Sequence, residues 1–99
     1  MTLEIANEAK IKVIYFDDES ALNQRKVFDG DAKALRKDVG EDWDGFDEGD
    51  SFQFNDDKVR VFEISERFST TGVCTSLLYF VGPFELNINK IKYDNLVES

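Results

Sequence analysis

The chain has 99 residues and a mass of 11.4 kDa, which suits one hydrophobic core, so we expect residues 1–99 to form a single domain. Its composition is 41% hydrophobic and 13% aromatic, which is far from that of a disordered chain. Histidine is absent. This absence excludes Ser-His or Cys-His catalysis, imidazole metal sites and a histidine pH switch.

The net charge of -9 comes from one segment of the chain. Residues 38–57 contain nine acids and no base, which leaves twelve of the 21 acids to balance all twelve bases elsewhere. The nine acids are Asp38, Glu41, Asp42, Asp44, Asp47, Glu48, Asp50, Asp56 and Asp57. Such acidity argues against direct contact with nucleic acid or an anionic membrane, because both would repel the protein unless a basic patch compensates.

The N-terminal third predicts one strand and one uncertain stretch. From Leu3 to Tyr15 apolar residues alternate with polar ones, which is typical of a strand with one buried face, with a turn at residues 6–8 as an open alternative. Residues 17–20 break the pattern and could cap a helical or irregular stretch from Ala21 to Phe28.

A short helix is predicted between Asp31 and Gly40. Asp31 is a good N-cap residue, glycine is typical after a helix C-terminus, and Ala32, Leu35 and Val39 share one face. A helix this short is unstable alone, so we expect it to pack on a sheet. Its bases, Lys33, Arg36 and Lys37, are expected on the exposed side.

The second half of the chain reads as strands and turns. Ser51 to Phe54 and Lys58 to Ser65 predict a hairpin, and the change of phase at Val61 and Phe62 indicates a β-bulge or a strand covered on both faces. Residues 69–72 form a loop, and the apolar run 73–81 predicts the most buried strand. After a turn at residues 82–83, a second alternation runs through residues 84–88 and shifts towards residue 93.

Together these elements predict an α+β fold: an antiparallel β-meander or small barrel of about five strands with one or two short helices. The single cysteine, Cys74, cannot form an intramolecular disulfide and lies in a strand-like run, so we expect it to be buried and structural. No apolar run is long enough to cross a membrane, and the first residues lack the pattern of a signal peptide. We therefore expect a cytoplasmic protein.

The acidic residues fit few kinds of chemical site. An EF-hand fails, because placing Gly45 at loop position 6 puts Gly40 at position 1, and placing Gly49 there puts Phe46 at position 3. Only a weak, non-standard cation site remains as an alternative. A domain of this size offers little cleft for paired carboxylates to act as acid and base. We expect no enzymatic activity, no catalytic residue, no metal site and no cofactor.

Direct nucleic-acid binding is a weak alternative. Five bases could form one basic face, but the aromatic residues that would stack on bases are mostly needed for the core. These bases are Arg25, Lys26, Lys33, Arg36 and Lys37.

The acidic segment is better suited to a positively charged protein. If its backbone were extended, Asp42, Asp44 and Asp50 would point one way, with residues two apart, such as Asp42 and Asp44, about 6.6 Å from each other. A DNA strand carries one charge about every 3.4 Å, so such a ribbon, using both faces, would approximate a phosphate backbone. The sequence therefore favours a DNA mimic that occupies the basic site of a nuclease or other nucleic-acid-binding protein.

Aromatic side chains within the segment are candidate anchors, because aromatic residues dominate interface hot spots. Trp43 and Phe46 are the candidates, although Trp43 could equally be a core residue; Phe52 and Phe54 are assigned to the core. The predicted partner-binding residues are Glu41, Asp42, Trp43, Asp44, Phe46, Asp47, Glu48, Asp50, Asp56 and Asp57.

The functional hypothesis is a non-enzymatic inhibitor of a nucleic-acid-processing protein. Phage or mobile-element inhibitors of restriction or CRISPR nucleases and toxin-immunity proteins are examples of this class. The alternative is a small β-rich assembly or adaptor module, whose sheet edge pairs with a subunit and whose acidity serves only solubility.

Overall fold

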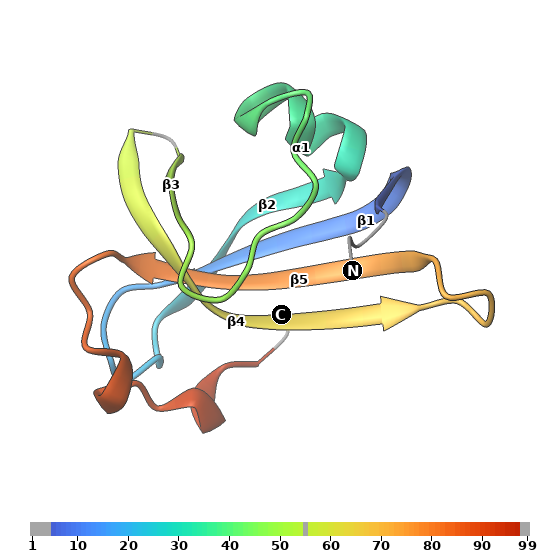
Figure 1. Ribbon diagram of the computed structural model, residues 1–99. Coiled ribbons are helices and arrows are strands. Elements are labelled where there is room, and N and C mark those ends of the chain that lie inside the picture. The colour runs from blue at the N-terminus through green and yellow to red at the C-terminus, as the bar shows by residue number, and fades with distance from the viewer. Residues whose placement is uncertain (1–4, 55, 98–99) are drawn as a thin grey trace.

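A computed structural model describes residues 5–54 and 56–97 of the chain. Five strands, one α-helix and two 3-10 helices are assigned in this part, and Figure 1 shows their arrangement. The strands are β1 (Ile5–Phe16), β2 (Gln24–Asp31), β3 (Ser51–Phe54), β4 (Asp57–Phe68) and β5 (Cys74–Pro83). The helices are α1 (Ala32–Val39), η1 (Ile88–Lys90) and η2 (Tyr93–Asn95).

The five strands form one curled sheet in the order β2-β1-β5-β4-β3. This arrangement confirms the predicted α+β fold with a small, partly closed sheet. The sheet is mixed, however, because β1 and β5 are parallel while all other neighbours are antiparallel. The parallel pair was not expected, since β5 lies between β1 and β4 and local alternation does not specify which strands become neighbours.

Helix α1 begins and ends where the capping residues predict. The Asp31 side chain accepts a hydrogen bond from Ala34 N at 2.8 Å, and Gly40 N donates to Arg36 O at 2.9 Å. Gly40 has a φ of 134°, which a side chain would strain. Ala32 and Leu35 are fully buried against the sheet, so the short helix is held by packing.

Two predicted segments have a different structure. The stretch expected to be helical or irregular up to residue 28 contains most of β2, an edge strand. The pairing of β1 with β2 shifts between Val13 and Ile14, where Val27 is an extra residue, so adjacent Val27 and Phe28 disrupt the alternation that would reveal a strand. At the other end, the alternation from Phe84 to Ile88 does not correspond to a strand, because this region forms a turn followed by η1 and η2.

The phase change in β4 is a genuine irregularity of the ladder. The register with β5 shifts between Val61 and Glu63, as expected for a bulge. As a result Val61 packs in the core on one face of the sheet, and Phe62 packs in the core on the other. The apolar run in β5 is the most buried strand, also as predicted.

Different segments of the chain cover the two faces of the sheet. On one face α1 and the loop between α1 and β3 lie over a core that includes Ile11, Leu35 and Tyr79. On the opposite face the C-terminal segment, residues 84–97, lies over a core that includes Phe16 and Phe80. Within the described residues, no helix is long and apolar enough to cross a lipid bilayer.

Candidate functional site

Residues 41–50, called the acidic loop below, carry six of the nine acids of the 38–57 segment. The loop contains no helix or strand and crosses in front of the sheet before entering β3 (Figure 1). Gly45 and Gly49 have positive φ values of 108° and 90°, which turn the chain. The condition of an extended backbone with regularly spaced carboxylates is therefore not met, and the charges follow an irregular path.

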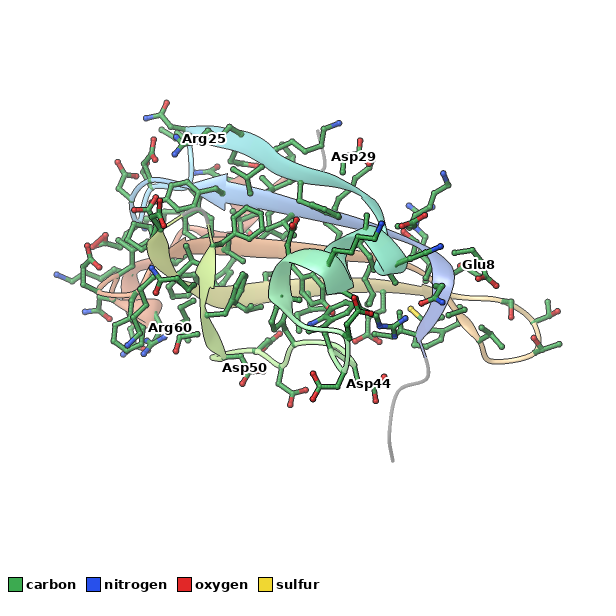
Figure 2. The ribbon with its side chains drawn as sticks, turned by 90° about the horizontal axis from the view of Figure 1, so that it is seen from above. Glu8, Arg25, Asp29, Asp44, Asp50 and Arg60 are labelled. Atoms are coloured by element: carbon green, nitrogen blue, oxygen red, sulfur yellow. The ribbon has the colours of Figure 1, made fainter. Side chains whose placement is uncertain are left out.

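All six carboxylate residues of the acidic loop are exposed. They are Glu41, Asp42, Asp44, Asp47, Glu48 and Asp50. Figure 2 shows Asp44 and Asp50 projecting away from the sheet on the same side of the molecule. The loop therefore presents its charge outward.

Trp43 points in the opposite direction, into the core. It is 8% exposed, and its ring lies 5.4 Å from that of Phe46 and 6.3 Å from that of Tyr79, measured between centroids. Phe46 in turn stacks on Phe52 at 4.2 Å. The four rings hold the loop against the sheet, so a partner could touch the Trp43 ring only if the loop lifted away.

Tyr79, in the centre of β5, supports the middle of the loop. Its hydroxyl oxygen accepts a hydrogen bond from Phe46 N at 3.3 Å. Burial raises the pKa of Tyr79 to about 12, against 10.0 for an ordinary tyrosine. The phenol is neutral at physiological pH and forms a buried, uncharged support beneath the charged loop.

Arg36 anchors the start of the loop, a role that the sequence did not predict. Its guanidinium donates to Trp43 O at 2.9 Å, to Ile5 O at 2.8 Å and to the Asn7 side chain. Arg36 was expected on the exposed side of α1, but it is half-buried. The only sequence signal for this role was its position one turn before the C-terminus of the helix, because a long side chain with hydrogen-bond donors can reach from there to the chain that follows.

The end of the loop is held by backbone hydrogen bonds. Gly49 N donates to Val61 O at 2.7 Å, and Val61 N donates to Asp50 O at 2.8 Å, so residues 49 and 50 pair with β4 as a strand would. Asp47 N donates to a side-chain oxygen of Asp50 at 2.8 Å. Both ends and the middle of the acidic loop are thus fixed.

The ion pairs defined in the described residues lie away from the acidic loop. Arg25 pairs with Asp17 at 3.3 Å, and Lys26 pairs with Asp29 at 3.0 Å. Arg36, although adjacent, donates to two carbonyls and an amide oxygen rather than to a carboxylate. These positions also weaken the alternative of one continuous basic face, since three of its five bases are already engaged.

The remaining acids of the 38–57 segment lie apart from the loop. Asp38 is exposed near the end of α1, and Asp56 and Asp57 are exposed at the turn beyond β3. Asp57 lines a cavity of about 200 Å³ together with Tyr15 and Arg25. The structure therefore brings six predicted carboxylates together on one loop and leaves Asp56 and Asp57 at the far end of β3.

No group of three or more acidic or cysteine side chains is positioned to hold a metal ion in the residues that the structure describes. Cys74 is 1% exposed, and burial raises the pKa of its thiol, so it is not activated as a nucleophile.

Comparison with family models, curated proteins and solved structures finds no match to this chain.

Proposed function

We propose that this protein is a non-enzymatic inhibitor that uses the acidic loop to occupy the basic site of a nucleic-acid-processing protein. The partner is a nuclease or another protein whose groove is built for a polyanion. Examples of this kind of protein are phage-encoded inhibitors of restriction or CRISPR nucleases and the immunity partners of toxins. Because the chain has a single cysteine, we assign this activity to the cytoplasm.

The proposal is supported by one observation: a loop bearing six exposed carboxylates is fixed to the sheet by buried rings and backbone hydrogen bonds. Fixing a loop before binding reduces the conformational entropy that binding must overcome. A solubilising tail needs no such anchoring. The balance of acids and bases outside residues 38–57 also concentrates the field of the protein on this region.

The expected interaction is fast and sensitive to salt. One exposed ion pair contributes only about 0.2–1 kcal/mol, so charge mainly accelerates encounter. Trp43 stabilises the loop from below, which leaves the half-buried Phe46 as the aromatic residue of the loop nearest the surface.

A displacement experiment tests the proposal. Proteins from a bacterial lysate are bound to immobilised duplex DNA at about 50 mM salt, and the purified protein is added to release those whose basic site it occupies. We expect release of a defined subset by the wild type. The substitutions Asp42→Asn, Asp44→Asn and Glu48→Gln together should abolish that release.

The matched control removes the same charge elsewhere. Glu8→Gln, Glu85→Gln and Asp94→Asn alter three exposed acids outside the acidic loop, so this variant should release the same proteins as the wild type. Equal release by the two variants would contradict the proposal, because net charge alone would then account for it. The alternative of an assembly module predicts no release by any of the three proteins.

A further inference from the structure

Strand β4 has an outer edge that β3 covers only in part. β3 pairs with β4 from Asp57 to Arg60, and Gly49 and Asp50 pair with Val61. Beyond Val61, no described strand pairs with β4 on this side, and this half of β4 forms the margin of the sheet in Figure 1. Unpaired backbone groups along such an edge are a template for another strand.

The open part of the edge includes a regular stretch of five residues, 63–67. Glu63 to Arg67 pair with β5 in continuous register, and register shifts lie on both sides of this stretch. Five residues is close to the length of an average strand. Ser65, Glu66 and Arg67 are exposed, so an incoming segment could reach the backbone here.

Acids of this edge lie on both faces of the sheet. Glu63 pairs with Phe80, which packs in the core on one face, and Glu66 pairs with Leu77, which packs in the core on the other.

Charge from the acidic loop adds to that of the edge. Burial raises the pKa of Tyr93, and the carboxylates of Glu63 and Glu48 raise it further. On the opposite face, Glu66 and Asp47 both act on Tyr79 in the same way. The base in the stretch, Arg67, makes an interaction of its own.

We propose that the β4 edge at Glu63 to Arg67 binds an extended, Lys- and Arg-rich segment of the partner as a sixth strand of the sheet. This inference rests on the proposed function, because it assumes a basic partner, and adds how that partner is held. Backbone hydrogen bonds to β4 supply a directional contact that carboxylates alone do not. Basic side chains of the added strand lie beside Glu66 on one face and beside Glu63 on the other.

A second copy of this chain is a poorer occupant. Each copy carries a net charge of -9, most densely beside this edge, so two edges would approach against their own repulsion. Self-pairing would be revealed if the edge amides exchanged more slowly as the concentration of the protein alone increased. That result would overturn the proposal of a basic partner strand.

The test uses the heptapeptide Lys-Lys-Val-Val-Lys-Lys-Val with blocked ends, which places Lys on both faces of an added strand, and amide hydrogen exchange of the full-length protein measured by NMR. We expect saturating peptide to slow exchange at alternate amides between Glu63 and Arg67 by at least about tenfold, because only alternate amides of a strand face its edge. The same peptide with N-methylated peptide bonds keeps its charge but cannot donate backbone hydrogen bonds. It should give no protection, and equal protection by both peptides, or none by either, would overturn the proposal.

Two variants separate the contribution of charge from that of folding. Glu63→Gln with Glu66→Gln should weaken binding of the Lys-Val peptide, whereas Glu8→Gln with Glu85→Gln should not. The outcome is distinguishable from that of the displacement experiment. If the peptide protects alternate amides but the loop substitutions do not change release from DNA, the edge proposal is supported and the loop proposal is refuted. If the loop substitutions abolish release but the peptide gives no protection, only the edge proposal is refuted.

Discussion

The acidic loop and the C-terminal segment cover opposite faces of the same sheet by similar means. Each lacks a strand, and each inserts one buried side chain, Trp43 in the loop and Ile91 in the C-terminal segment. Each is also tied down by hydrogen bonds, which in the C-terminal segment include Lys92 N to Glu19 O at 2.8 Å and the Gln24 side chain to Asn95 O at 2.6 Å.

The two segments differ in charge. Residues 41–50 hold six acids and no base, while residues 84–97 hold two acids and two bases. A neutral segment therefore covers one face of this sheet adequately, so covering a face does not require acidity. The charge of the acidic loop needs another explanation, which is why we connect it with a basic partner.

The largest expected effect comes from removing the ring that holds the loop. Trp43→Ala should lower the free energy of unfolding by about 3–5 kcal/mol, because it leaves a cavity beneath the loop, and Ile91→Ala by about 2–5 kcal/mol. Urea denaturation measures both. Only Trp43→Ala should accelerate amide exchange at Gly49 and Val61, and a loss below about 1 kcal/mol would mean that the ring does not fix the loop.

A pH titration tests the buried anchor under the loop. The pKa of Tyr79 is about 12 in the folded protein and 10.0 for an ordinary tyrosine, so between these values the unfolded chain loses a proton that the folded state keeps. Stability should therefore fall as pH rises through this range, by about 2–3 kcal/mol from this group. Tyr79→Phe should show a fall smaller by that amount; curves that stay parallel from pH 10 to 12 would contradict the assigned burial.

Arg36 is expected to have an intermediate effect. Arg36→Ala removes donors from two carbonyls and should cost about 1–3 kcal/mol, together with faster exchange in the first residues of the loop. Lys33→Ala, at an exposed position on the same helix, should change stability by less than about 0.5 kcal/mol. Similar losses for the two variants would show that the hydrogen bonds of Arg36 do not hold the loop.

The smallest effect on folding is expected from the loop carboxylates themselves. Substituting Asp42, Asp44 and Glu48 by their amides should leave the free energy of unfolding within about 0.5 kcal/mol, with a slight increase because like charges no longer repel. Thermal and urea unfolding measure this change. A loss above about 2 kcal/mol would mean that these charges serve the fold, and the contrast with the C-terminal segment would lose its meaning.

Local signals in the sequence were sufficient for some elements. Helix α1 was predicted from Asp31 and Gly40, which act within one turn, and the bulge in β4 from the apolar pair Val61 and Phe62. The parallel pairing of β1 with β5 could not be predicted, because it joins residues far apart in the chain. β2 was missed because an exposed, bulged edge strand has little alternation.

The candidate site was predictable in its charge but not in its shape. The exposure of the six loop acids follows from the cost of burying a carboxylate, whereas the sequence left Trp43 equally suited to the core or to a partner. Its burial depends on Phe46, Phe52 and Tyr79, which meet only in the folded chain. The role of Arg36 depends on the same long-range packing.

The most direct test of the central claim is the salt dependence of release from immobilised DNA, measured between about 50 and about 200 mM salt. We predict that release by the wild type weakens steeply as salt increases. The variant neutralised at Asp42, Asp44 and Glu48 should lose release even at the lowest salt, whereas the variant neutralised at Glu8, Glu85 and Asp94 should follow the wild-type curve. Coincident curves for the two variants would contradict the claim that the acidic loop, rather than the total charge, is recognised.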